Sequence, residues 1–154
     1  MLLPSYPKSL SRSRICCTAR RLARSTFASV KSLTGTSGPA HSGAPLAPNY
    51  ISEAKGKGGS SDVLLRQAMH NGAYAARAMH SLQNYGSASP VYDGSAYTIG
   101  ATHHDGQLKL YAIHPVQAAD AAMGTEYHMT RLNSYAMTGS VDGFRRGAAA
   151  YRNA

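Results

Sequence analysis

Apolar side chains recur at helical spacing behind a pair of serines near position 60. One stripe holds Leu64, Ala68, Ala75, Met79 and Leu82. Charged and polar side chains lie mostly opposite this stripe, which is typical of a helix packed against a core. Ser60 or Ser61 suits the N-cap, Asp62 suits the first turn, and Gly86 suits the end. The pattern therefore predicts one long helix, weakened in its middle by Gly72.

Extended segments are indicated on both sides of this helix. Residues 49–55 form a short candidate strand that ends at a glycine-rich run. Residues 96–102 and 107–113 suit two further strands, and Asp105-Gly106 between them is a strong signal for a tight hairpin turn. His114-Pro115 is expected to end the second of these strands.

Two more helices are predicted toward the C-terminus. One spans residues 126–137, and Ser140 caps another over residues 141–152. A strand, a helix, a hairpin and further helices together predict an α/β chain of the α+β class, with a small sheet and flanking helices.

Charge is distributed unevenly along the 154 residues. Residues 1–49 hold seven of the 16 Lys and Arg residues and none of the seven acidic ones, whereas the remainder is nearly balanced. Wound as a helix, this leader places Ile15, Leu22 and Val30 on one stripe, with most arginines opposite. A basic, serine-rich, acid-free amphipathic N-terminus is typical of a mitochondrial import sequence. A disordered basic tail or an incorrect gene start remains an equal alternative, with the cytosol or nucleus as the location. No apolar run is long enough to span a bilayer.

Composition also sets the expected boundaries. Residues 1–35 form the basic leader, and residues 36–48, rich in Gly, Ser and Pro, form a linker. One folded body is expected from residue 49 to residue 154. Cys16 and Cys17 are adjacent within the leader, so they suit neither a C-x-x-C metal site nor a spaced disulfide framework.

Candidate chemistry lies on the first strand. Glu53 and Lys55 are two positions apart, so they project from the same face of an extended segment. A carboxylate there can hold a divalent cation while an ammonium orients water toward a phosphodiester, as a metal-dependent nuclease requires. An ordinary surface ion pair is the alternative. His103 and His104 are expected at an exposed turn, and the chain has neither a Walker-type loop nor a G-x-S-x-G elbow.

Longer strings give a more specific indication. LLRQAMHNGAYAARAMHSLQNYG (64–86), VYDGSAYT (91–98), LKLYAIHP (108–115), EYHMTRLNSYAMTGS (126–140) and FRRGAAAYRNA (144–154) resemble a group of uncharacterised fungal proteins. Those proteins carry a domain related to the PD-(D/E)XK nuclease superfamily. The resemblance begins near residue 49 and implies a nuclease-like sheet with flanking helices.

The same resemblance implies roles for individual residues. Glu53 would be the metal-binding carboxylate, Lys55 would orient or help activate the attacking water, and Gln67 would match a glutamine often found near such sites. The implied cofactor is Mg²⁺, which takes one or two carboxylates and keeps several waters. The implied partner is nucleic acid.

One feature of the superfamily is missing. Its members carry a further carboxylate upstream of E-x-K, and this chain has no Asp or Glu before Glu53. A single carboxylate is a poor Mg²⁺ site. We therefore expect a partial, N-terminally incomplete copy of the domain, degenerate or truncated, which does not cleave nucleic acid. The alternative is a non-enzymatic small mitochondrial or interaction protein.

Overall fold

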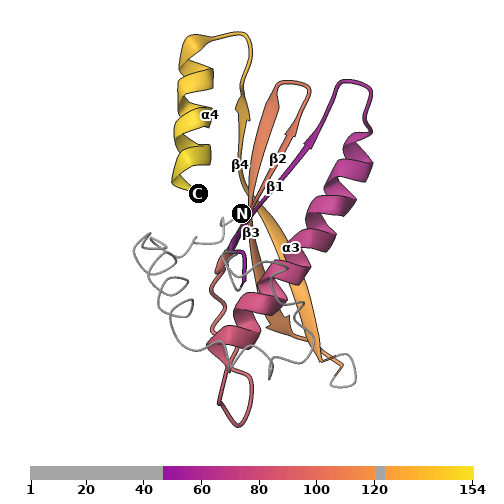
Figure 1. Ribbon diagram of the computed structural model, residues 1–154, viewed down its shortest axis with the longest axis vertical. Coiled ribbons are helices and arrows are strands. Elements are labelled where there is room, and N and C mark those ends of the chain that lie inside the picture. Colours follow the sequence, from indigo (N-terminus) through magenta and orange to yellow (C-terminus); the bar gives the residue numbers. More distant parts are fainter. Residues whose placement is uncertain (1–46, 121–123) are drawn as a thin grey trace, which may run out of the picture.

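The computed structural model describes residues 47–120 and 124–154. The basic leader, most of the linker and the two cysteines lie outside the described residues. The described elements are β1 (Tyr50–Lys55), α3 (Ser61–Gln83), β2 (Thr98–His104), β3 (Gln107–Gln117), β4 (Thr125–Ala136) and α4 (Val141–Asn153) (Figure 1). A four-stranded mixed sheet with two helices confirms the expected α+β class.

The strands lie in the order β1-β2-β3-β4. β1 and β2 are parallel, while β2, β3 and β4 form an antiparallel meander. A parallel pair requires a crossover connection, and α3 supplies it. The strand order makes β1 an edge strand of the described sheet. It matches the strand predicted over residues 49–55, although it begins at Tyr50.

Helix α3 follows the predicted pattern closely. All five residues of the predicted stripe are buried. The Ser60 hydroxyl accepts a hydrogen bond from the Asp62 backbone N–H at 3.3 Å, which caps the N-terminus. The helix ends at Gln83, before the predicted terminator Gly86, because the Asn84 side-chain amide donates to the His80 carbonyl at 2.9 Å.

Gly72 has a packing role that its helix propensity does not reveal. A Cβ at this position would lie 2.8 Å from Cδ1 of Ile113, which is only 2 % exposed on β3. A Cβ on Gly100 of β2 would likewise lie 3.0 Å from Cδ1 of Ile113. The two glycines therefore let α3 sit close to the sheet with Ile113 filling the space between them.

The β2-β3 hairpin forms where the sequence predicts it. Asp105 and Gly106 have φ angles of 46° and 69°, and these positive values are those of a tight two-residue hairpin turn. Three boundaries of these strands were wrong, because the first strand also ends later, at His104. The first strand starts at Thr98, and the second continues through Pro115 to Gln117. Pro115 is tolerated because pairing with β2 stops at Ile113, so β3 has only β4 beside it there.

The helix predicted over residues 126–137 is wrong, because this segment is strand β4. It pairs with β3 along its whole length. In its first half Thr125, Tyr127 and Met129 are half-buried and alternate with exposed residues, which is a strand period. A bulge at Leu132, between the pairs Leu110–Asn133 and Tyr111–Arg131, breaks this alternation and imitates helical spacing.

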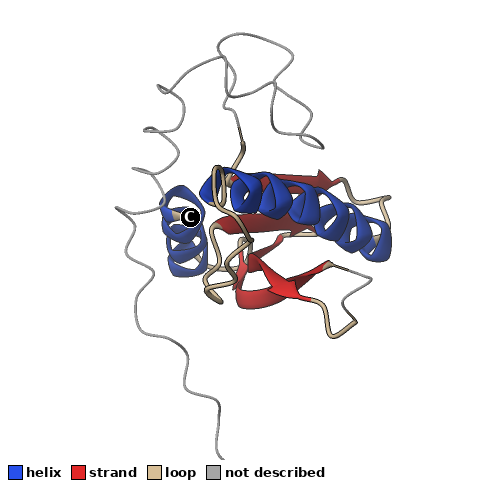
Figure 2. Ribbon diagram, turned by 90° about the horizontal axis from the view of Figure 1, so that it is seen from below, coloured by secondary structure: helices blue, strands red, loops and turns tan. Residues whose placement is uncertain are grey.

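The two helices lie against opposite faces of the sheet. Asn71 of α3 bonds to Glu53 of β1, whereas Tyr151 of α4 reaches Tyr50 and Ser52. Alternate residues of a strand point to opposite faces, so we name these the α3 face and the α4 face. Figure 2 shows α3 running along the strands and α4 standing apart from it.

Helix α4 begins as the sequence predicts. The Ser140 hydroxyl accepts a hydrogen bond from the Gly143 backbone N–H at 3.0 Å. The α4 face holds an apolar cluster built from Ala101, Leu108 and Leu110, against which Tyr50, Tyr135, Met137 and Ala150 pack. Among residues 47–120 and 124–154, neither helix has the length and apolar character needed to cross a membrane.

Candidate functional site

Glu53 and Lys55 lie where the E-x-K pattern places them, side by side on the α3 face of β1. Both side chains are half-buried, while Ser52 and Ala54 on the other face are exposed. The Asn71 side-chain amide of α3 donates to Oε1 of Glu53 at 2.5 Å. The carboxylate is therefore held in position by a helix amide.

Gln67, the third residue implied by the resemblance, lies one helical turn before Asn71. It is exposed and shares that flank of α3, because residues four apart on a helix are neighbours. Within the described part of the chain, no hydrogen bond joins it to Glu53. Sequence reasoning missed Asn71, although its spacing of four residues from Gln67 is the signal that would have indicated it.

Strand register extends this polar face across the sheet. Glu53 pairs with Thr102, and Thr102 pairs in turn with Lys109. Two residues further along β1 and β2, Lys55 pairs with His104, and His104 pairs with Gln107. Directly paired residues point to the same face, so two rows of polar side chains cross β1, β2 and β3. Only the β1 members of these rows are visible as a sequence motif.

The loop after β1 is fixed over one of these rows. Nε2 of His104 lies 2.9 Å from the Gly59 carbonyl oxygen, within hydrogen-bonding distance. A Cβ on Gly59 would lie 2.9 Å from Cβ of Lys55, so a glycine is required at this approach. His103 is exposed, as expected of a turn histidine, but His104 is half-buried and anchors the loop. Lys57 projects from this loop into solvent.

The donor set around Glu53 does not fit the implied Mg²⁺. One Glu53 oxygen already accepts the Asn71 amide, and the carboxylate has no acidic neighbour on its strand. In residues 47–120 and 124–154, no three His, Cys, Asp or Glu side chains form a group that could hold a metal. Mg²⁺ demands an octahedral set of oxygen ligands, usually with one or two carboxylates.

Comparison of the chain with protein-family models, with curated proteins and with solved structures gives no match.

Proposed function

We propose that residues 49–154 form a nuclease-like domain, related to the PD-(D/E)XK superfamily, that binds nucleic acid without metal-dependent cleavage. The observation that supports this most is the arrangement of Glu53 and Lys55 on one face of an edge strand, beneath a helix that carries Gln67 and Asn71. The lone carboxylate argues against hydrolysis through Mg²⁺.

Binding is assigned to the lysines at the end of β1. Lys55 is half-buried beside the loop, and Lys57 is exposed within it. An exposed ammonium on a glycine-rich loop can approach a phosphate oxygen closely, and such contacts give salt-dependent affinity without sequence preference. The Glu53 carboxylate accepts a hydrogen bond from Asn71.

Titration of labelled single- and double-stranded DNA and RNA into the full chain, with fluorescence anisotropy as the readout, tests this proposal. We expect binding that weakens with salt, and Lys57→Ala should reduce the slope of log affinity against log salt by about 0.7–0.9. Arg152→Ala is the matched control, because it removes an exposed cation from α4 and should leave the slope unchanged.

The same samples with Mg²⁺ or Mn²⁺ test cleavage. We expect intact substrates on a denaturing gel. Cleavage that disappears in both Glu53→Ala and Lys55→Ala would show instead that the domain is an active nuclease. If none of the DNA and RNA substrates binds in a salt-dependent way, the nucleic-acid proposal is excluded as a whole.

A second candidate function, a non-enzymatic interaction protein, is favoured by one feature of α4. Val141 and Phe144 lie three residues apart and are 65 % and 53 % exposed, so a short apolar strip faces solvent. Sedimentation of the full chain decides whether this strip joins two copies. Concentration-dependent association that Phe144→Ser abolishes would favour this second function.

A further inference from the structure

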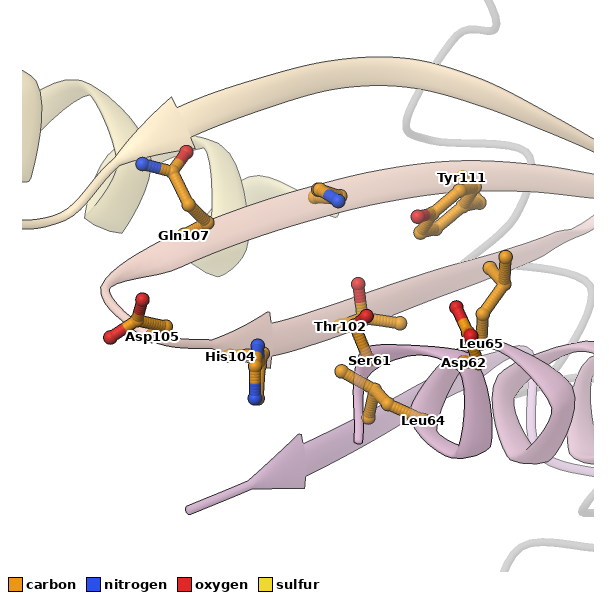
Figure 3. Close-up of a pocket in the computed structure, with 10 residues that line it drawn as sticks. Ser61, Asp62, Leu64, Leu65, Thr102, His104, Asp105, Gln107 and Tyr111 are labelled. Carbon is orange, nitrogen blue, oxygen red and sulfur yellow. The ribbon is translucent and has the colours of Figure 1, made fainter. Parts of the chain in front are cut away.

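A second feature of the α3 face is a cavity of about 310 Å³ between the start of α3 and the β2-β3 hairpin. Its helix side is formed by Ser61, Asp62, Leu64 and Leu65. Its sheet side is formed by alternate residues of the hairpin strands, as Figure 3 shows for Thr102 and Tyr111. The volume lies at the lower end of the range of about 300–1,000 Å³ for small-molecule sites.

The cavity does not include Glu53 or Lys55. Asn71, which bonds to Glu53, and the cavity residues Asp62 and Leu65 lie on opposite flanks of α3, because their helical positions differ by about half a turn. Leu64, which also lines the cavity, is buried and lies about two helical turns before Asn71. The cavity therefore lies beside Glu53 and Lys55, and the residues of β2 and β3 in the two polar rows belong to its lining.

Two buried residues with hydroxyl groups line this cavity. Thr102 is 4 % exposed and Tyr111 is 7 % exposed, and both contribute to the cavity wall. Among the residues that the structure describes, neither hydroxyl has a protein hydrogen-bond partner. A hydroxyl can both donate and accept, so each can bond to an occupant.

The charges around the cavity decide what kind of occupant fits. Asp62 and Asp105 are the acidic residues of the lining, and Lys109 and His104 are its basic residues. An anion such as phosphate would meet two carboxylates, and like charges repel. A neutral group with both donors and acceptors matches the carboxylates, the hydroxyls and the ammonium together. Leu64 and Leu65 add an apolar wall, against which a flat ring can pack.

We propose that this cavity binds a nucleobase. The inference rests on the proposed function, which brings nucleic acid to this face of the sheet. Asp62 accepts from the N–H groups of the base, while Lys109 and the two hydroxyls donate to its carbonyl and ring nitrogen atoms. A base can pack against the leucines and form hydrogen bonds with the carboxylate, ammonium and hydroxyl groups of the cavity. This binding brings no phosphate beside the aspartates.

The test is a titration of the isotopically labelled full chain with guanosine, adenosine, cytidine and uridine, followed by amide chemical shifts. Inorganic phosphate serves as the comparison ligand. We expect shifts at Thr102 and Tyr111 with at least one nucleoside and none there with phosphate. Tyr111→Phe and Thr102→Val should each weaken nucleoside binding about 2- to 10-fold, the loss expected for one hydrogen bond.

Tyr74→Phe is the matched control, because it removes a phenol that is 57 % exposed on α3 and does not line the cavity. Phosphate shifts equal to the nucleoside shifts, or no nucleoside shifts at the cavity, would overturn the nucleobase assignment. Polymer binding that depends on Lys57 but not on Tyr111 would overturn the cavity inference and leave the proposed function standing. Nucleoside binding at the cavity without polymer binding would remove the proposed function and retain the cavity.

Discussion

The two faces of the sheet are covered in different ways. Helix α3 has 23 residues, and its buried side holds seven of them against the sheet. Helix α4 has 13 residues, and Gly147 is its only buried residue. The sheet surfaces show the reverse order, because the α4 face carries the leucines while the α3 face carries the polar rows of Glu53 and Lys55. The longer helix, which has more buried residues, therefore covers the more polar face of the sheet.

This contrast indicates how a polar face can be placed in a small domain. Ile113 lies between Gly72 and Gly100 and brings α3 close to the sheet at one point. Away from Ile113, the sheet surface beneath α3 is free to carry polar groups, because the close apolar contact between helix and sheet is made at Ile113. We infer that folding depends mainly on the α3 face and that α4 is an accessory element.

The largest effect should come from removing the contact that holds α3. Ile113→Ala deletes a side chain that is 2 % exposed, and we expect a loss of about 2–5 kcal/mol in the free energy of unfolding. Urea unfolding followed by circular dichroism measures it. The control is Phe144→Ala on α4, which should change stability by less than about 0.5 kcal/mol.

Equal losses in these two variants would contradict the inferred hierarchy. They would show that Phe144, although 53 % exposed, is covered by something that stabilises the fold.

A smaller and more local effect is expected at Gly147. A Cβ there would overlap the sulfur of Met137 and approach Cβ of Tyr135 to 3.0 Å. Overpacking costs about 1–3 kcal/mol, which exceeds the helix-propensity gain of up to about 1 kcal/mol from Gly to Ala. We expect Gly147→Ala to loosen α4, so hydrogen exchange should accelerate over residues 141–153 and stay unchanged over residues 61–83. Faster exchange throughout both helices would mean that the faces are not independent.

The two serine caps offer a matched pair. Ser60→Ala removes the α3 cap and should lower global stability by about 0.5–2 kcal/mol. Ser140→Ala removes the α4 cap and should lower only the protection of that helix against hydrogen exchange. A global loss from Ser140→Ala as large as that from Ser60→Ala would place α4 in the same cooperative unit as α3.

Sequence reasoning succeeded where local chemistry determines local structure. The stripe beginning at Leu64, the cap at Ser60 and the Asp105-Gly106 turn each depend on neighbours in the chain, so their patterns are visible without the fold. The same reasoning failed at β4, because the bulge at Leu132 shifts its apolar residues toward a helical spacing.

The candidate site was partly predictable for a related reason. Glu53 and Lys55 share a strand, so their common face follows from spacing alone. Asn71, Thr102 and Lys109 join that face through the crossover and the strand register, which no local pattern encodes. Long-range pairing therefore defines most of the polar face.

The smallest expected effect is a pH dependence on the α4 face, away from α4. His114 pairs with His128 across β3 and β4, and their ring centroids are 5.7 Å apart. Burial, and then the charge of His128, lower the pKa of His114 below its usual 6.5. Below about pH 6.5 the unfolded chain binds a proton at this position that the folded chain resists, so stability should fall as the solution is acidified.

Replacing His114 tests this sign directly. Urea unfolding at pH 7.5 and pH 5.5 should show a smaller acid-induced loss for His114→Gln than for the native chain. His128→Gln is the control, because it removes the charge effect on His114 while leaving the burial that dominates its pKa, so part of the loss should remain. The Glu126 carboxylate lies 3.7 Å from Nε2 of His128. A loss in His114→Gln equal to that of the native chain would assign the acid sensitivity to other histidines and remove this difference between the two faces.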